Sequence, residues 1–437
     1  MVLLKNLLNI FNIPELRKKV LFTLGVLIVF RFGGKIPIIG IDIEMLKELM
    51  TRQTGLGGLF GYLDLFSGGS LSSCTIFTLG ISPYITASIL MQMSSMTIPW
   101  LEALSKEGEH GRRLINDYTR YLTLAVAFVQ STGYVVFLEK QGLVLSPGWE
   151  FRFTFVLTTV VGAMFVMWLG EQISMFGIGN GSSMLIFAGI VANFPAYIVT
   201  VLAQIQQGYM DWMWGVVILA IFIFVSSCIV YLEKGERKIP VQYARRIVGN
   251  RVYGGQSTYI PFKINTAGVM PVIFAGSMLN LPMFAFSMLG SRWEIFKNIT
   301  EYMTRGGIIY NIILFGLIIA FSFFYTALIF NPEELAQNIK KQGGYIPGVR
   351  PGRKTAEYFN YILTRIGLVG AIYLGILALL PNLLNIFIDM PFFLSGTALL
   401  IVVGVALETA AQIESYLLEH RYEGLLTTGR FKSRGTR

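Results

Sequence analysis

Few side chains in this chain have the types and spacing that catalysis or metal binding requires. Cys74 and Cys228 are the only cysteines, and their separation indicates neither a disulfide framework nor a metal site, so we expect both to pack as small apolar residues. His110 and His420 lie in charged loop segments, which argues against a histidine metal site. The sequence has no Gly-x4-Gly-Lys-Ser/Thr phosphate loop and no nucleophile–base set. We therefore expect no enzyme activity and no cofactor.

Ionisable residues are scarce within the long apolar segments, where coupled transport would need a proton or cation site. Glu171 is expected at the end of one such segment, and Arg365 within two turns of a cytoplasmic end. Glu408 follows Ile401 by about 10 Å of helix rise toward the cytoplasm. Each of these charged residues is better explained by a side chain that extends to the membrane surface, or that lines the funnel of a pore, than by an ion-coupling site.

The apolar segments carry branched side chains next to breaks in the backbone pattern. In the stretch Gly80-Ile81-Ser82-Pro83-Tyr84-Ile85, the spacing places Ile81 and Ile85 on one helix face, and Pro83 is expected to kink the helix. Ordinary helix packing explains one isolated isoleucine pair better than a pore does. The pair therefore needs support from the elements around it.

Residues 55–70 form a glycine-rich stretch between two apolar segments. Six of its sixteen residues are glycine, and Asp64 lies within it. Because glycine costs a helix about 1 kcal/mol relative to alanine, the pattern predicts at most a short, weakly held helix. Lipid does not tolerate unsatisfied backbone groups, so the stretch must lie against protein, in a cavity or at the surface. The stretch is typical of a movable plug, and a plug implies a pore.

The composition predicts that these features lie in a membrane. Of the 437 residues, 54% are hydrophobic and 14% are charged, and the mean hydropathy is +0.61, whereas a soluble protein carries about 25% charged residues. Ten segments approach or exceed the roughly 20 residues that cross a bilayer. They are 20–36, 73–95, 115–137, 153–174, 183–205, 212–232, 266–289, 307–330, 358–380 and 392–413. We predict an all-α polytopic membrane protein with ten transmembrane helices.

Lysine and arginine indicate the orientation. Most of the 35 Lys and Arg residues fall in the two tails and in the segments 96–120, 233–265 and 331–357, which the positive-inside rule assigns to the cytoplasm together with both termini. The last two segments are longer than connectors need to be, which favours docking to a large cytoplasmic partner, although simple anchoring by positive charge is the alternative. Residues 256–261 have a β-like pattern.

The ten predicted spans divide into two sets of five. The N-terminal half is 1–205, which includes the stretch 55–70, and the C-terminal half is 206–437, which includes the two long loops. An odd number of spans reverses the topology, so the halves are candidates for an inverted repeat. The sequence itself shows no clear similarity between the halves.

Six stretches, taken together, resemble one known family. They are LGISPYITASI at 79–89, GIGNG at 177–181, IFAGIV at 186–191, NTAGVMP at 265–271, FYTAL at 324–328 and PGVRPG at 347–352. This set resembles the SecY family of bacterial protein-translocation channels, the counterpart of the eukaryotic Sec61 α subunit, over nearly the whole chain. The resemblance implies two pseudo-symmetric halves around a central hourglass pore.

The resemblance also implies a ring of branched apolar side chains at the constriction of the pore. The matching positions are Ile81, Ile85, Ile186, Ile273 and Ile401. A narrow apolar collar dewets and blocks ions, while its flexible side chains move apart around a polypeptide. The stretch 55–70 then matches the plug of the outer funnel. The plug residues are Phe60, Gly61, Tyr62, Leu63, Asp64, Leu65 and Phe66.

Two further sites are implied by the resemblance. A lateral gate is expected between the second and third spans on one side and the seventh and eighth on the other. Its polar residues are Thr86, Gln92, Gln130 and Asn265, for which generic interhelical hydrogen bonds are an equal alternative. The loops 233–265 and 331–357 match the docking site for the ribosome and the SecA motor. The basic residues expected there are Arg350, Arg251, Arg246 and Arg245.

The function implied is that of the central pore-forming subunit of the Sec translocon in the bacterial cytoplasmic (inner) membrane. The expected partners are SecE and SecG, the SecA ATPase, the ribosome, signal peptides, nascent chains and membrane lipid, with no small-molecule substrate. The alternatives are an inverted-repeat secondary transporter and a membrane-anchored scaffold without a pore. The sequence lacks the buried charges that a secondary transporter would need. A scaffold without a pore leaves the glycine-rich stretch and the collar unexplained.

Overall fold

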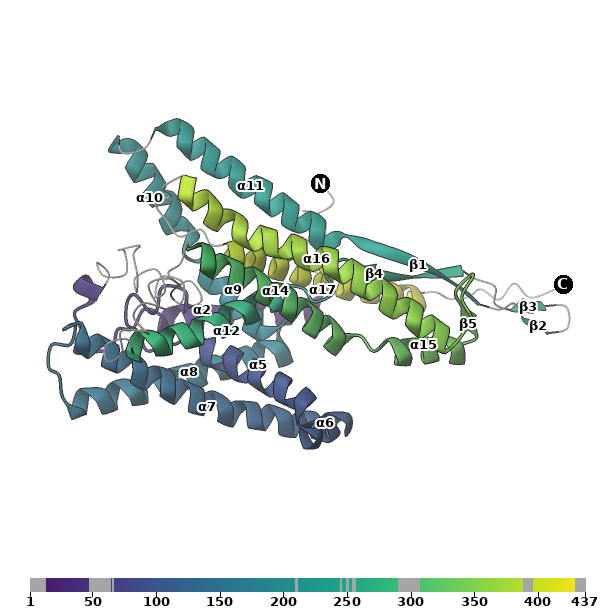
Figure 1. The fold of residues 1–437 in the computed structure, drawn as a ribbon, viewed down its shortest axis with the longest axis horizontal. Coiled ribbons are helices and arrows are strands. Elements are labelled where there is room, and N and C mark those ends of the chain that lie inside the picture. Colours follow the sequence, from purple (N-terminus) through teal and green to yellow (C-terminus); the bar gives the residue numbers. More distant parts are fainter. Residues whose placement is uncertain are drawn as a thin grey trace. The chain divides into compact units, whose positions relative to one another are not determined.

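The computed structural model describes residues 13–46, 64, 67–208, 211–243, 246–248, 251–253, 257–289, 307–387 and 396–428. The chain is mostly helical (Figure 1). In this described part, seven helical segments are long and apolar enough to cross a membrane. They are Glu109–Lys140, Trp149–Phe176, Gly181–Gln206, Trp212–Lys234, Ile309–Lys341, Arg353–Leu380 and Gly396–Glu419. The predicted helical membrane fold is confirmed, and the count of ten spans stays a prediction.

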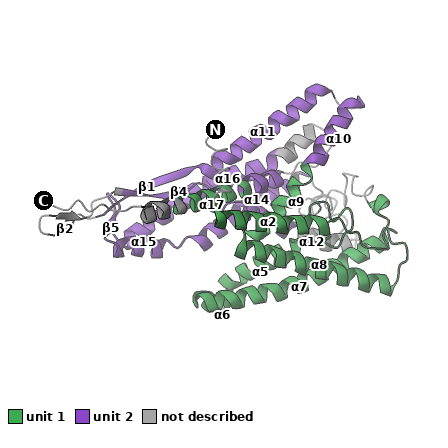
Figure 2. Cartoon of the chain, turned by 180° about the vertical axis from the view of Figure 1, so that it is seen from behind, with its two compact units in different colours: residues 1–49, 63–194, 405–437 green, residues 50–62, 195–404 purple. Residues whose placement is uncertain are grey.

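Two compact units make up the chain (Figure 2). Unit 1 contains residues 1–49, 63–194 and 405–437, and unit 2 contains 50–62 and 195–404. The long last helix, α17 (Gly396–Thr428), contributes residues to both units. The predicted division into 1–205 and 206–437 stays a prediction.

Unit 1 is built from apolar helices that pack in antiparallel succession. Its helices include α2 (Pro14–Gly33), α5 (Ser82–Thr97), α6 (Pro99–Lys106), α7 (Glu109–Lys140), α8 (Trp149–Phe176) and α9 (Gly181–Val191). Helix α7 packs against α5 and α8, while α8 also packs against α9 and α2. Tyr134 of α7 and Phe155 of α8 are fully buried where their helices meet, with ring centroids 5.9 Å apart.

The second predicted span, 73–95, is wrong at its beginning. Residues 76–81 form turns, and α5 begins at Ser82. Gly80 has a φ of +54°, a left-handed conformation that an α-helix does not contain. Pro83 occupies the first turn of α5, where its missing N–H would be unpaired in any residue. Pro83 therefore helps to start the helix and does not kink it.

The fifth predicted span, 183–205, matches the candidate span Gly181–Gln206, but two helices make it up. Helix α9 ends at Val191, and α10 (Phe194–Gln206) begins three residues later. Pro195 in the first turn of α10 explains the interruption, because a proline ring clashes with the preceding helical turn. Each part of the segment remains helical.

Unit 2 combines apolar helices with a small sheet. Its long helices are α11 (Trp212–Lys234), α12 (Met270–Leu289), α14 (Ile308–Ile329) and α16 (Arg353–Phe387). Helix α14 packs against α12 and α16, and α11 also packs against α16. The ring of Phe274 on α12 makes edge-to-face contacts with Phe321 and Tyr325 of α14, a favourable geometry for aromatic pairs.

The two long loops of unit 2 form one sheet. Strands β1 (Glu236–Tyr243), β4 (Ser257–Lys263) and β5 (Gly344–Tyr345) lie in the order β4-β1-β5, all antiparallel. Strand β4 confirms the β-like pattern predicted for 256–261. Between β1 and β4, the short strands β2 (Arg246–Val248) and β3 (Arg251–Tyr253) pair with each other.

This sheet has its own hydrophobic core. Val241 of β1, Phe262 of β4 and Phe359 of α16 are each almost completely buried in it. Helix α15 (Pro332–Lys341) adds Ala336 and Ile339. We call β1, β4, β5, α15 and the first part of α16 the docking module, because these elements fold the two predicted docking loops around one core.

Candidate functional site

Three of the five predicted collar isoleucines lie in unit 1. Ile81 is the N-cap residue of α5, and its carbonyl accepts the backbone N–H of Ile85 at 3.1 Å. The two side chains are therefore one helical turn apart, as predicted, and both are buried. Ile186 is buried on α9. Gly170 of α8 leaves space beside Ile81, since a Cβ built there lies 3.6 Å from the Ile81 Cδ1.

The other two collar residues lie in unit 2. Ile273 is buried in the first turns of α12, and Ile401 is completely buried in α17. A collar of all five residues draws on both units and stays a prediction.

Most of the predicted plug residues lie outside the described residues. They are Phe60, Gly61, Tyr62, Leu63, Leu65 and Phe66. Asp64 is described, and its Oδ1 accepts the backbone N–H groups of Leu71 and Ser72, each at 2.9 Å, and the hydroxyl of Ser67 at 3.2 Å. Burial raises the pKa of the Asp64 carboxyl above its ordinary value, and these hydrogen bonds oppose the shift.

Three of the predicted gate residues lie on α5 and α7. Thr86 is buried on α5, and the Gln92 Nε2 on the same helix donates to the Ser88 Oγ at 3.2 Å. Gln130 is half-buried on α7, which packs directly against α5. The Gln92 Oε1 is buried without a hydrogen-bond partner in the described part of the chain. A polar group in that position is costly unless a partner reaches it.

Asn265 has local partners in unit 2. Its Nδ2 donates to the Glu233 Oε2 and to the Gly268 carbonyl, both at 2.9 Å. Glu233 lies at the end of α11, just before β1, so Asn265 ties the base of the docking module to the start of α12. The lateral gate as a whole draws on both units and stays a prediction.

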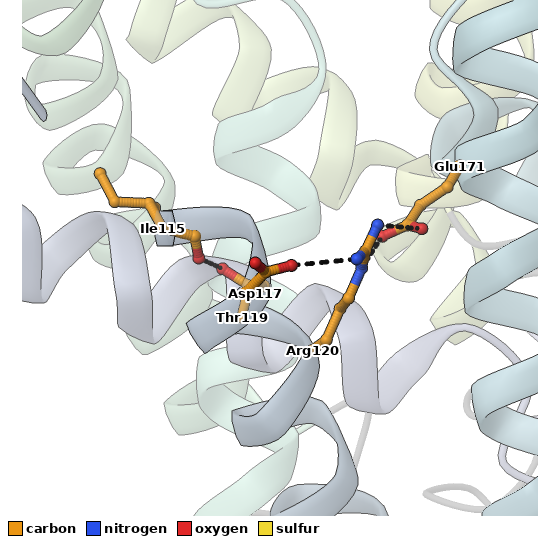
Figure 3. Close-up of polar contacts among 5 residues, drawn as sticks. All are labelled: Ile115, Asp117, Thr119, Arg120 and Glu171. Carbon is orange, nitrogen blue, oxygen red and sulfur yellow. Dashed lines mark hydrogen bonds and ion pairs between the residues drawn. The ribbon is translucent and has the colours of Figure 1, made fainter. Parts of the chain in front are cut away.

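A charged cluster in unit 1 was not predicted from the sequence. The Arg120 guanidinium of α7 donates from Nε and Nη2 to the two carboxylate oxygens of Glu171 on α8, both at 2.8 Å (Figure 3). Its Nη1 also donates to the Asp117 Oδ1 at 3.0 Å. Glu171 lies five residues before the end of α8 at Phe176. Two-point contact of this kind fixes both distance and orientation between the helices.

The other charges noted in the spans have simpler surroundings. The Arg365 guanidinium lies over the Tyr361 ring, 4.2 Å from its centroid, one turn away on α16. Glu408 is exposed on α17. Among the described residues, no group of three or more His, Cys, Asp or Glu side chains is arranged to hold a metal ion.

Three of the four predicted docking arginines are described, and they lie in or beside the docking module. Arg350 is exposed between β5 and α16, and its carbonyl accepts the Thr355 Oγ1 at 3.0 Å. Gly348 and Gly352 on either side have positive φ angles of +83° and +107°, which present the Arg350 backbone at a tight turn. Arg246 begins β2 and Arg251 begins β3. Arg245 lies outside the described residues.

Comparison with known proteins identifies the relatives of this chain. The family model described as SecY matches residues 75–410. The protein translocase subunit SecY of Escherichia coli (strain K12) is 44% identical over 430 residues, which cover 97% of each chain. The protein of the same name from Streptomyces coelicolor is 46% identical over 435 residues, covering 95% of this chain and 98% of the relative.

Solved structures share the fold. The structure of a protein conducting channel aligns with a TM-score of 0.66 at 19% identity, covering 95% of each chain. Sec61 in the canine ribosome–channel complex from the endoplasmic reticulum aligns with a TM-score of 0.62 at 18% identity, again over 95% of each chain.

Proposed function

The chain belongs to the SecY family, and from that premise we propose that it is the central pore-forming subunit of a Sec translocon. It passes unfolded secretory proteins across the bacterial cytoplasmic membrane and releases membrane segments laterally into the lipid. The observation that carries this conclusion is the identity to translocase subunits over nearly the whole chain. The protein crosses this membrane several times, with both termini in the cytoplasm.

The channel is passive, and the energy for translocation comes from partners. The SecA ATPase or the translating ribosome drives the substrate, and SecE and SecG complete the membrane complex. The exposed Arg350 and the basic strands β2 and β3 support docking of such partners at the docking module. The shared core of that module supports one rigid platform in place of two independent loops.

The seal is an isoleucine collar at Ile81, Ile85, Ile186, Ile273 and Ile401. Support comes from their burial and from the one-turn spacing of Ile81 and Ile85 at the start of α5. Branched apolar side chains exclude water from a narrow pore, yet each has enough rotamer freedom to move aside for a polypeptide. Residues 55–70 are the plug over this collar, and the α5–α7 pair carries one side of the lateral gate.

Photocrosslinking tests the channel directly. Photoreactive amino acids at Ile85 and Ile401 are challenged in membranes with a stalled secretory chain. We expect adducts to the stalled chain at both positions, because a collar surrounds the chain that it admits. The matched control is Ile223, an exposed isoleucine in α11, where no adduct is expected.

The same experiment separates the alternatives. Absence of adducts at Ile85 and Ile401, together with uptake of a small solute into vesicles, would favour an inverted-repeat secondary transporter. Absence of both adducts and solute uptake would favour a scaffold without a pore. Adducts at Ile223 equal to those at Ile85 would show that the stalled chain reacts without passing through a collar.

A further inference from the structure

One carboxylate closes the turn at the C-terminal end of the stretch 55–70. The Asp64 Oδ1 accepts the N–H groups of Leu71 and Ser72, both at 2.9 Å, while the Ser67 hydroxyl donates to the Asp64 carbonyl and carboxylate at 3.1 and 3.2 Å. The enclosed turn contains Gly68 and Gly69, with φ angles of +69° and +84°. Residues other than glycine rarely adopt such φ angles. This turn is therefore a specific structure, and Asp64 holds it closed.

The same turn is attached to three helices of unit 1. The Arg31 Nη1 of α2 donates to the Gly68 carbonyl at 2.9 Å. The hydroxyl of Tyr134, buried on α7, donates to the Leu71 carbonyl at 3.3 Å. A Cβ added at Gly68 would lie 2.8 Å from the Gly189 Cα of α9, so the two backbones are in direct contact. The turn therefore cannot shift without breaking contacts to α2, α7 and α9.

The chain that follows the turn is also fixed. The Ile38 N–H donates to the Cys74 carbonyl at 2.9 Å, and the Ile76 N–H donates to the Ile36 carbonyl at 3.1 Å. Cys74 has a φ of +44°, and it is the only described non-glycine residue with a positive φ. Such a conformation persists only where the surrounding contacts over-determine it. The Phe77 ring also stacks on the rings of Phe30 on α2 and Phe165 on α8, so the attachment extends to within four residues of Ile81, the N-cap residue of α5.

We propose that Asp64 is a positioning residue that fastens residues 67–81 as a fixed foot between α2, α7 and α9. The foot begins inside the C-terminal end of the proposed plug, 55–70, and fixes that end, 67–70, relative to Ile81. This inference rests on the proposed channel function and deepens it. It assigns a role to Asp64, the single acidic side chain within residues 55–70.

Hydrogen exchange of the full-length protein, in membranes with its partner subunits, tests the fastening. We expect Asp64→Ala to accelerate exchange of the Leu71 and Ser72 amides about tenfold, because both lose a charge-assisted acceptor. Asp64→Asn keeps an oxygen that accepts the same two N–H groups, and its exchange should stay close to that of the unchanged protein. Exchange in Asp64→Ala equal to that of the unchanged protein would overturn the proposal.

Asp42 provides a matched control in the same unit. Its Oδ1 accepts the N–H groups of Glu44 and Met45 at 3.1 and 3.2 Å, a similar local arrangement. We expect Asp42→Ala to leave exchange at Leu71 and Ser72 unchanged. Equal acceleration by Asp42→Ala would mean that the effect is a general loss of stability, and would overturn the specific role of Asp64.

A deletion separates this inference from the plug itself. Removal of residues 55–62 should increase ion leak if the plug assignment is correct, while the Leu71 and Ser72 amides keep their protection if the foot is independent. A deletion variant that does not leak ions and keeps these amides protected would contradict the plug assignment but not the foot. A deletion variant that leaks ions and also loses this amide protection would contradict the foot but not the plug assignment.

Discussion

Ile85 lies in the first turn of α5, one turn after Ile81, and both side chains are buried. We expect Ile85→Asn to raise ion conductance through membranes that contain the channel several-fold, because an amide in the collar binds water and lowers the barrier to ions. The measurement is ion flux in vesicles reconstituted with the complete complex. The yield of folded protein should fall by a smaller factor than the factor by which ion flux rises.

Ile85→Val is the control for this substitution. Valine keeps a branched apolar side chain and removes one methylene, which costs about 1 kcal/mol in a buried position. Conductance should therefore stay near that of the unchanged protein. If the Ile85→Asn channel conducted ions as poorly as the Ile85→Val channel, Ile85 would not be part of the collar.

The contact between Arg120 and Glu171 is a pairing that the sequence does not predict. The sequence indicated a rare charge within a span at Glu171, and the positive-inside rule placed Arg120 in a cytoplasmic segment. Nothing in their spacing pairs them, because the chain between them, 51 positions from one to the other, includes a turn and most of two helices. Only the register of α7 against α8 brings the guanidinium to the carboxylate.

At the scale of elements, the docking module depends on Phe262. Its ring lies 5.7 Å from that of Phe330 and 5.5 Å from that of Phe359, measured between centroids. We expect Phe262→Ala to destabilise the module by about 3–5 kcal/mol, because it leaves a cavity in a small core. Limited proteolysis should then cut within 233–265, and partner-driven translocation should fall while membrane insertion persists.

Tyr259 supplies the comparison on the same strand. Its side chain is 59% exposed, on the opposite side of β4 from Phe262. Tyr259→Ala should leave the protease resistance of the loop unchanged. Equal sensitivity of the two variants would mean that β4 is held by its strand pairing and not by the core.

The elements differ in how well the sequence predicts them. Strand β4 was indicated by its own pattern, whereas β1 was not, because charged residues and Pro240 obscure the alternation of Ile239 and Val241. The start of α5 was missed for a related reason. Residues 73–81 are as apolar as a helix, and the left-handed backbone at Cys74 and Gly80 shows that they are not one.

At the scale of the whole molecule, the fold class followed from hydropathy and from the distribution of lysine and arginine. Family resemblance contributed the functional sites, which hydropathy alone does not provide. The collar and the lateral gate depend on residues from both units, so their prediction rests on that resemblance. The foot at Asp64 had no signal beyond the glycines around it, because its partners are backbone groups and distant helices.

Arg350 tests how the whole complex uses its cytoplasmic face. We expect Arg350→Glu to reduce SecA-driven or ribosome-driven translocation at least severalfold, since it reverses an exposed charge at the proposed docking surface. Ion leak and membrane insertion should not change, because Arg350 lies outside the membrane. The measurement is protease protection of a secretory substrate imported into vesicles.

Lys341→Glu is the matched charge reversal, at an exposed residue in the last turn of α15. A much smaller loss of translocation is expected there. If both reversals were equally harmful, the partner would be responding to net charge and not to a specific contact with Arg350.

The composite origin of the docking module also determines when it is completed during synthesis. Val241 and Phe262 are made before α12 and α14, whereas Ile339 and Phe359 are made after them. The first loop therefore emerges with half of a core and stays unfinished, for seconds at ordinary elongation rates, while two more apolar helices are made. A newly made copy therefore completes the surface proposed to receive its partner only after α12 and α14 have been made.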